Sequence, residues 1–188
     1  RKKRPPHRTK INLSMASFHS KTFLKHDDYM TPAYAWKNVR EFIPKGKVIY
    51  EPFYGDGTSG DILTELGFRV IHEPMDFFAM DDAVGDILVS NPPFSKKKEV
   101  FTRLKQLGKP FMMICPSSLI NTQYFRKLFA EDENPIQIII PRKRIQFKKL
   151  VDGKVPKDWG SRCNFDCFYY CWKMNLPRDI VWLDDNAE

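Results

Sequence analysis

Residues 48–67, VIYEPFYGDGTSGDILTELG, contain a strand, a glycine-bearing turn and a helix in close succession. Val48-Ile49-Tyr50 is a short apolar run that predicts a strand, and Asp61 to Leu66 has helical periodicity that Gly67 ends. In open α/β sheets the ligand crevice lies at the carboxyl ends of strands, where glycines let the backbone approach a nucleoside closely. The turn from Gly55 to Gly60 therefore fits either a structural turn or a cofactor loop.

The alternation of strands and helices continues on both sides of this unit. Further strands are expected at 68–72, 86–90, 111–115 and 136–140, and further helices at 33–42, 98–107 and 123–129. Strands separated by helices predict an α/β fold with a mostly parallel sheet covered by helices on both faces. The aromatic stretch Asn164 to Lys173 is expected to pair with Arg142 to Phe147 as a C-terminal antiparallel hairpin on that sheet.

Length and charge limit the organisation of the chain and its partners. The 188 residues suffice for one domain, expected at 26–188, behind a basic arm at 1–25. The arm fits three roles equally well: a grip on phosphates, a nuclear import signal or a solvated tail. The formal net charge of +8 favours an anionic partner, nucleic acid above all, without separating DNA from RNA. Because neither a signal peptide nor a membrane-spanning run is evident, we expect an intracellular protein of the nucleus or cytoplasm, without a membrane partner.

Three of the four cysteines recur at every fourth position, at Cys163, Cys167 and Cys171. On a strand this spacing places the three thiols on one face, as a metal or redox site would require. The aromatic residues around them favour a different interpretation, since a free cysteine packs as a small hydrophobic residue in a core. We therefore expect no metal site.

A second motif, Asn91-Pro92-Pro93-Phe94, directly follows the apolar strand expected at 86–90 and so lies at the same carboxyl edge of the sheet. Two consecutive prolines restrict the backbone and remove two amide donors, which leaves carbonyl groups as acceptors. Acceptors from the Asn91 side-chain oxygen and the Pro92 carbonyl would draw the hydrogens of a conjugated amine out of plane and localise its lone pair. Phe94 offers a face for stacking a flat base. The alternative is an ordinary proline-rich loop after a strand.

The order of these motifs resembles that of S-adenosylmethionine-dependent amino methyltransferases, in particular compact phage- and virus-type adenine-N6 methyltransferases. Four segments carry the resemblance, which covers roughly Asp27 to Lys173: Thr31-Pro32, Glu51-Pro52-Phe53-Tyr54-Gly55-Asp56-Gly57, Asp76-Phe77-Phe78 and Asn91-Pro92-Pro93-Phe94. It implies a Rossmann-like class I methyltransferase fold, S-adenosylmethionine as the cofactor, and transfer of a methyl group to the N6 amine of adenine in DNA or RNA.

The resemblance also implies a role for each motif. The segment around Thr31 lies against the methionine carboxylate of the cofactor, the glycine turn passes beneath its ribose, Glu73 holds the ribose hydroxyls and Asp76 binds the adenine amine. The residues implied to bind the cofactor are Tyr29, Thr31, Glu51, Pro52, Phe53, Gly55, Gly57, Glu73, Asp76 and Phe77. The residues implied to be catalytic, by binding the target amine, are Asn91, Pro92, Pro93 and Phe94.

Two basic stretches near the expected mouth of the site are candidates for phosphate contacts. They comprise Lys96, Lys97 and Lys98 after the second motif, and Arg142, Lys143 and Arg144 later in the chain. No segment has room for an inserted target-recognition domain, so target specificity is expected to be loose, or to be supplied by a protein partner or by parts of a longer chain.

The Asn-Pro-Pro-Phe motif does not by itself name the amine. It also occurs in guanine-N2 RNA methyltransferases, and close variants occur in enzymes that methylate glutamine in proteins, although the basic charge argues against glutamine. A further alternative is a non-catalytic nucleic-acid-binding subunit that keeps the fold. Such subunits commonly lose one of the two motifs, and both are intact here.

Overall fold

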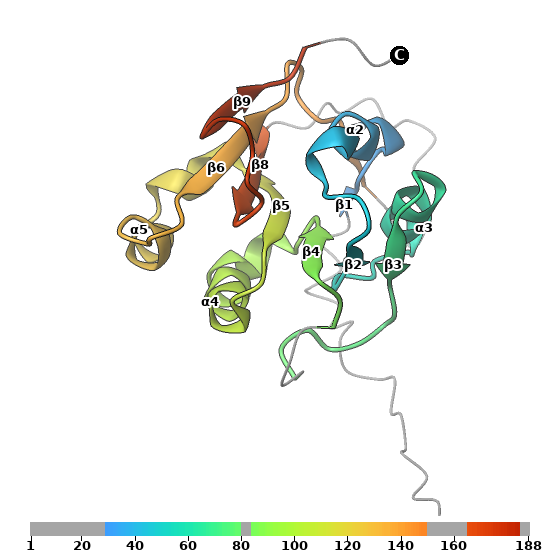
Figure 1. Ribbon diagram of the computed structural model, residues 1–188, viewed down its shortest axis with the longest axis horizontal. Helices are drawn as coiled ribbons and strands as arrows, with labels where there is room; N and C mark the ends of the chain where they lie inside the picture. The colour runs from blue at the N-terminus through green and yellow to red at the C-terminus, as the bar shows by residue number, and fades with distance from the viewer. Residues whose placement is uncertain (1–28, 80–83, 150–164, 185–188) are drawn as a thin grey trace, which may run out of the picture.

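The structure, a computed structural model, describes residues 29–79, 84–149 and 165–184. The arm expected at 1–25 and Cys163 lie outside these ranges. Seven strands form one sheet in the order β3-β2-β4-β5-β8-β6-β9, and β1 and β7 form a separate pair (Figure 1). The strands are β1 (Tyr29–Met30), β2 (Val48–Tyr50), β3 (Arg69–Ile71), β4 (Ile87–Ser90), β5 (Phe111–Pro116), β6 (Ile136–Ile140), β7 (Lys148–Lys149), β8 (Cys167–Trp172) and β9 (Ile180–Trp182).

The sheet is mostly parallel, with one antiparallel strand inserted near its C-terminal end. Strand β2 pairs in parallel with both β3 and β4, β4 with β5, and β6 with β9. Strand β8 lies between β5 and β6 and is antiparallel to both. This arrangement is the Rossmann-like class I methyltransferase fold that the sequence predicts.

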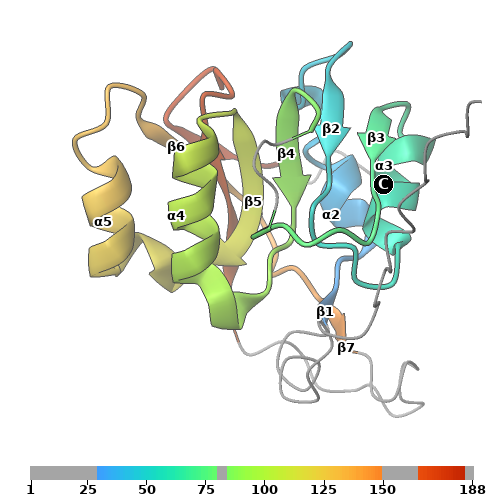
Figure 2. The same ribbon diagram turned by 90° about the horizontal axis from the view of Figure 1, so that it is seen from below.

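Helices cover both faces of the sheet, which makes three layers (Figures 1 and 2). The helices are α2 (Ala33–Lys37), the 3-10 turn η1 (Arg40–Phe42), α3 (Thr58–Glu65), η2 (Phe94–Lys96), α4 (Lys97–Leu107), η3 (Ser117–Asn121) and α5 (Gln123–Phe129). Residues of α2 and α3 share one buried cluster with one face of the sheet, and residues of α4 and α5 share a second cluster with the other face. None of the helices in the described ranges has the length and apolar character needed to cross a bilayer.

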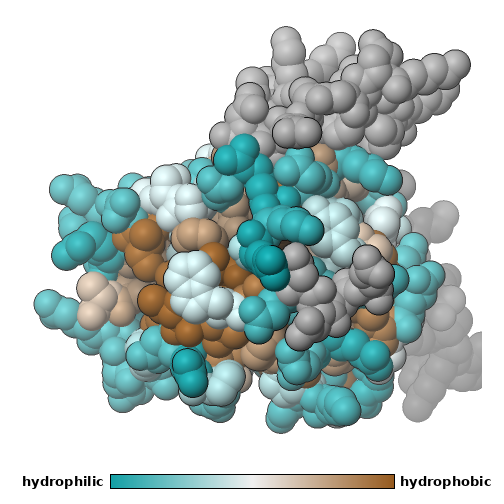
Figure 3. All heavy atoms as spheres, turned by 90° about the horizontal axis from the view of Figure 1, so that it is seen from above, coloured by the Kyte–Doolittle hydropathy of each residue, from teal (hydrophilic) through white to brown (hydrophobic). Residues whose placement is uncertain are grey.

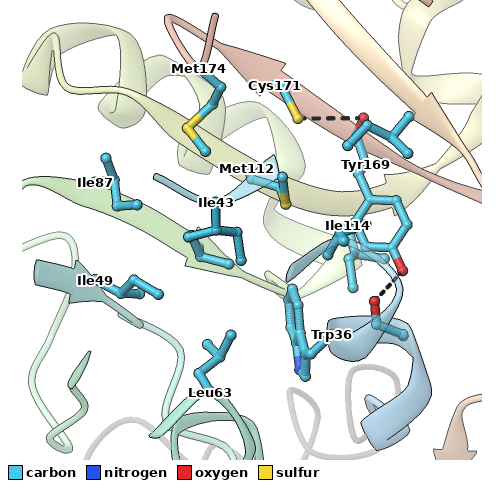
Figure 4. Packing of buried hydrophobic residues seen from close by; sticks show 14 of the residues in the cluster. Trp36, Ile43, Ile49, Leu63, Ile87, Met112, Ile114, Tyr169, Cys171 and Met174 are labelled. Atoms are coloured by element: carbon cyan, nitrogen blue, oxygen red, sulfur yellow. Dashed lines mark hydrogen bonds between the residues drawn. The ribbon is translucent and has the colours of Figure 1, made fainter. Parts of the chain in front are cut away.

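The first cluster packs around Trp36, whose side chain is fully buried between α2, α3 and the sheet (Figure 4). The Trp36 ring Nε1–H donates a hydrogen bond to Ser59 Oγ at 3.3 Å, which ties α2 to α3. The Tyr169 hydroxyl of β8 donates to the Ala35 carbonyl at 2.7 Å, which ties α2 to the sheet. Cys167 and Cys171 are buried in the same cluster, as expected for core residues.

The second cluster is rich in aromatic rings. Phe101 of α4 meets Phe111 of β5 edge to face at 5.7 Å and Phe125 of α5 at 5.2 Å between ring centroids. Such pairs add about 0.5–1.5 kcal/mol each beyond the apolar area that they bury. This packing holds α4 rigidly on the sheet, and α4 is the helix that follows the Asn-Pro-Pro-Phe motif.

The prediction that the stretch Asn164 to Lys173 pairs with Arg142 to Phe147 is wrong. Arg142 to Phe147 forms no strand, and β8 instead fills the space between β5 and β6. Five of the six β8 residues are buried, and the strands on both sides of it, β5 and β6, lie inside the sheet. The segment 142–147 carries exposed charges at its start and could not occupy such a position. Its apolar residues, Ile145 and Phe147, are buried against the first cluster as part of a connection.

The helix expected at 33–42 is also shorter than predicted. It ends at Lys37, and a 3-10 turn follows at 40–42. Val39 leaves helical geometry, with φ −109° and ψ 6°, and both Val39 and Ile43 are buried in the first cluster. The predicted bounds are confirmed for β2, β6 and α5, and lie within one or two residues for β3, β4, β5 and α4. Helix α3 begins three residues before the predicted Asp61.

Candidate active site

Strand β2 has β3 on one side and β4 on the other. The chain therefore adds strands first in one direction from β2 and then in the opposite direction, and the order reverses between β2 and β4. In open α/β sheets, ligands bind at such a switch point, outside the carboxyl ends of the strands. The loop after β2 carries Glu51 to Gly57, and the loop after β4 carries Asn91 to Phe94. Both sequence motifs therefore meet at the position where this fold binds ligands.

The loop after β2 is a tight turn that leads into α3. The amide of Gly57 donates to the Tyr54 carbonyl at 2.9 Å, and the amide of Thr58 donates to Asp56 Oδ1 at 3.0 Å. Gly55 and Gly57 have φ values of +57° and +89°, in the left-handed region that favours glycine. A Cβ atom on Gly57 would also lie 3.3 Å from the Tyr54 hydroxyl. The two glycines are thus required by the path of the backbone, with or without a ligand.

Glu51 joins the ends of three strands. Its carboxylate is 1% exposed and accepts a short hydrogen bond from the Ser90 hydroxyl at the end of β4. The other carboxylate oxygen lies 2.6 Å from His72 Nδ1, just beyond β3. The amide of Phe53 donates to the same carboxylate at 3.3 Å. Glu51 therefore fixes the strand ends relative to one another, and its Oε2 atom has the ion pair with His72 but no further hydrogen-bond partner among the described residues.

Burial and pairing alter the protonation of Glu51 and His72. Burial raises the pKa of Glu51, against the opposing effects of His72 and Ser90. Burial lowers the pKa of His72, but the hydrogen bond and charge of Glu51 outweigh it and leave the pKa raised. Burial therefore favours the protonated form of Glu51, whereas the nearby carboxylate favours the protonated form of His72.

Asn91 is held by one half of its side-chain amide. Its Nδ2 group donates to the Tyr29 carbonyl of β1 at 3.1 Å. Its Oδ1 atom is buried and has no hydrogen-bond partner among the described residues. An unsatisfied buried acceptor costs about 1–3 kcal/mol and calls for an explanation, and a ligand donor is one.

The rest of the motif continues along the same loop. Pro92 and Pro93 are buried, and Phe94 is half-buried at the start of η2. Phe94 stacks on Tyr29 at 6.2 Å between centroids and meets Phe165 edge to face at 5.5 Å. The Phe94 ring is thus oriented by aromatic neighbours and keeps part of its surface exposed.

Strand β1 brings the N-terminal segment to the site (Figure 2). It pairs with β7, Tyr29 opposite Lys149 and Met30 opposite Lys148. Thr31, directly after β1, is only 5% exposed. A Cβ atom on Gly55 would lie 3.7 Å from Met30 Cε, so the glycine turn and the segment around Thr31 are neighbours, as the resemblance implies.

The loop after β3 supplies two further carboxylates. The Asp76 carboxylate accepts from the Phe78 amide at 2.9 Å, whereas Glu73 is exposed. Burial raises the pKa of Tyr50 to about 12, with further increases from the charges of Glu51, Asp76 and Glu73. All three carboxylates are thus close enough to Tyr50 for their charges to act on its hydroxyl.

Phe53, in the loop after β2, contacts Phe77, in the loop after β3. Phe77 is 3% exposed, and its ring lies 5.0 Å from that of Phe53 between centroids. Pro52 is buried beside them. Phe77 acts mainly as packing for the loop, whereas its neighbour Phe78 is 40% exposed.

The basic candidates differ in their surroundings. Lys96 and Lys98 are exposed, whereas Lys97 is half-buried and its Nζ group donates to the Phe94 carbonyl at 2.6 Å. Lys97 therefore stabilises the motif loop itself.

In the second basic stretch, Arg142 and Lys143 are exposed, and Arg144 pairs with Asp166 through Nε to Oδ1 at 2.7 Å and Nη2 to Oδ2 at 3.3 Å. The charge of Arg144 is thus already compensated in part. Phe147, five residues after Arg142, contacts the Phe94 ring edge to face at 6.2 Å, so this stretch leads directly to the motif loop.

Sequence reasoning missed the two residues that complete the Glu51 contacts, Ser90 and His72. Both stand at the carboxyl ends of predicted strands, which is the signal that could have identified them. His72 pairs with Glu51, and its ring stacks on that of Tyr54 at 4.5 Å between centroids. Among the described residues, no group of three or more His, Cys, Asp or Glu side chains is arranged to hold a metal ion.

Comparison of the sequence with protein-family models and with curated proteins finds no match. Among solved structures, one from Pyrococcus horikoshii, described as a proposed RNA methyltransferase, is similar at 16% identity and a TM-score of 0.44. The match covers 86% of this chain and 91% of that chain. The fold assignment rests on the strand order, and the reaction is argued from the site.

Proposed function

We propose that the chain is an S-adenosylmethionine-dependent N-methyltransferase that acts on the N6 amine of adenine in nucleic acid. The observation that carries the proposal is the Asn91 side chain, whose Nδ2 group is bound to the Tyr29 carbonyl while Oδ1 is buried without a partner among the described residues. Because the amide is oriented from one side, Oδ1 is a preformed acceptor for an N–H donor from outside the protein. An exocyclic amine is such a donor.

The residues around the switch point fit the cofactor. Left-handed glycines at Gly55 and Gly57 allow close approach of a nucleoside, and Asp76 offers a carboxylate for an adenine amine. Thr31 is buried directly after Met30, which lies beside the glycine turn, where the methionine end would lie. The cofactor would supply an electrophilic methyl group.

The chemistry asked of the protein is positioning and polarisation. An amine conjugated to a purine ring is a weak nucleophile, because its lone pair is delocalised. Acceptance of its hydrogens by Asn91 Oδ1 and the Pro92 carbonyl would favour a pyramidal nitrogen with a localised lone pair. Holding that nitrogen in line with the methyl group would let the N–CH3 bond form as the S–CH3 bond of the cofactor breaks, with a neutral thioether as the leaving group and the extra amine proton released to solvent. This positioning converts a bimolecular reaction into an intramolecular one, without a covalent enzyme intermediate.

The surroundings favour nucleic acid as the substrate. Lys96 and Lys98 are exposed directly after the motif, and Phe94 keeps a partly open face for a base. A base in a duplex must leave the stack to reach such a loop, at a cost of a few kcal/mol, so single-stranded or terminal sites are favoured. We propose that target choice depends on a protein partner or on parts of a longer chain.

The direct test is incubation with isotopically labelled S-adenosylmethionine and separate pools of DNA, RNA and capped RNA, followed by nucleoside mass spectrometry. We expect labelled N6-methyladenine in at least one pool, absent with Asn91→Ala. Labelled N2-methylguanine would replace the adenine proposal by the guanine alternative. Cofactor binding by calorimetry with no methylated nucleoside in any pool would favour the non-catalytic subunit.

A further inference from the structure

Strand β9 is the exposed edge of the sheet and is apolar on both faces. Ile180 is 50% exposed and Trp182 is 70% exposed, whereas Val181 and Leu183 are partly buried against the first cluster. On the described part of the chain, no strand lies beyond β9. Figure 3 views the molecule from above Figure 1, the side on which β9 and α2 lie. This face carries an apolar area bordered by hydrophilic side chains.

The backbone of β9 offers hydrogen bonds outward. Toward β6, the Ile138 amide donates to the Asp179 carbonyl at 2.7 Å, and the Leu183 amide donates to the Ile140 carbonyl at 3.0 Å. Residues alternate along a strand, so the amides and carbonyls of Ile180 and Trp182 point away from β6. An exposed edge with outward backbone groups and large apolar side chains is a template for pairing with another chain.

The sequence of the edge is complementary to itself. If two copies of residues 178–184 pair antiparallel about Val181, the outward backbone groups of Ile180 meet those of Trp182 from the other copy. The same register places Arg178 opposite Asp184 of the other copy. A shift by two residues in either direction destroys both matches, because it brings a charged residue opposite an apolar one.

We infer that the chain forms a two-fold symmetric dimer through β9, which joins the two seven-stranded sheets into one. Cross-strand pairs of this kind stabilise the pairing of antiparallel strands. Each pair occurs twice in the dimer because the interface is isologous. Only the side chain of Arg178 takes part, because its carbonyl already accepts from Gln137 Nε2 at 3.2 Å.

The dimer leaves the candidate active site open. Four strand spacings separate β4 from β9, which is about 19 Å at about 4.8 Å per strand. The inference is therefore independent of the proposed reaction, and its test measures mass rather than activity.

The test is sedimentation equilibrium of the full chain and of two charge reversals, Arg178→Asp and Asp184→Arg. The intact chain should sediment at twice its mass of 22.2 kDa. Each reversal places like charges opposite each other twice, so its dimer dissociation constant should rise by about tenfold or more. Both side chains lie at the exposed edge, and circular dichroism should confirm that each variant is folded.

An equal mixture of the two variants provides the decisive measurement. In a mixed dimer, the aspartate introduced at position 178 of one variant faces the arginine introduced at position 184 of the other. The unchanged Asp184 of the first variant faces the unchanged Arg178 of the second, so both charge pairs are restored. We expect the mixture to regain the dimer while each variant alone does not. A monomeric intact chain at every concentration, reversals that remain fully dimeric, or a mixture that stays monomeric would each overturn the inference.

Discussion

In the proposed function, Asn91 combines a structural contact and a chemical one in a single side chain. Its Nδ2 group anchors β1 through the Tyr29 carbonyl, and this contact fixes the direction in which Oδ1 points. Replacement by alanine removes both. A test of the chemical role must therefore separate loss of the acceptor from loss of the anchor.

We predict that Asn91→Ala lowers the rate of methyl transfer by about a hundredfold or more, the usual effect of removing one preorganised polar contact to a transition state. Affinity for the cofactor, measured by calorimetry, should change little. Asn121→Ala, an exposed asparagine in η3, should leave both quantities unchanged. Near-normal turnover by a folded Asn91→Ala variant would contradict the role assigned to Oδ1.

Ser90, Glu51 and His72 form the second group of residues with a defined role. The carboxylate is fully enclosed, so each contact replaces one that water would have made. Ser90→Ala removes one donor without changing the shape of the core appreciably. We predict a loss of about 1–3 kcal/mol in the free energy of unfolding, measured with urea, because the Glu51 oxygen is left without that donor. Ser118→Ala, at an exposed serine of η3, should have a much smaller effect.

The Glu51–His72 pair also predicts a dependence of stability on pH. The pKa of His72 is raised in the folded protein, so its contribution is fully present below the ordinary value of 6.5 and is lost as pH rises through the higher folded value. The raised pKa of Glu51 acts in the same direction. The difference in unfolding free energy between the intact chain and His72→Gln should therefore shrink from pH 6 upward. A difference that grows with pH would show that the pair does not hold the proton.

Among the elements, those with a clear apolar pattern were predicted well. Val48–Tyr50, Ile136–Ile140 and Gln123–Phe129 have the bounds that their apolar patterns indicate. The partner of β8 was not predictable in the same way, because pairing depends on which strands can accept a strand that is buried on both faces. Strands β1 and β9 were not predicted, and the strands with which they pair define them.

In the candidate site, the positions of the motif residues were predicted, whereas their contacts were not. Motif residues were placed at the right edge of the sheet, because strand ends follow from apolar runs. The contacts of Glu51 with Ser90 and His72 were not foreseen, since three loops must be brought together before a buried carboxylate needs them. Their roles toward a cofactor or a base remain predictions.

Helix α3 depends on a close approach to the end of β3. Gly60 lies so near His72 that an added Cβ atom would stand 2.2 Å from the ring Cδ2 atom. An exposed glycine in a helix would gain about 1 kcal/mol on replacement by alanine. We predict the opposite sign here, a loss of about 1–3 kcal/mol, because the core must shift to accept the methyl group. Glu65→Ala, at an exposed position of the same helix, serves as the control, and a stabilising Gly60→Ala would show that the contact is loose.

At the scale of the molecule, the two ends of the strands differ in chemistry, although both carry exposed lysines. The carboxyl ends of the strands carry the candidate site and the exposed Lys96 and Lys98. The opposite edge carries exposed Lys45 and Lys47, directly before β2. All four lysines contribute equally to the net charge, whereas the proposed function involves only Lys96 and Lys98.

This difference gives a matched test of how the positive charge is used. Binding of a single-stranded oligonucleotide should weaken with salt, and each lost phosphate contact should reduce the slope of log affinity against log salt by about 0.7. We predict a smaller slope for Lys96→Gln with Lys98→Gln, because both side chains lie beside the motif loop. Lys45→Gln with Lys47→Gln removes the same net charge from the far edge and should leave the slope close to that of the intact chain. If the two double variants gave the same slope, the positive charge would act as a general field and the phosphate contacts assigned to Lys96 and Lys98 would be wrong.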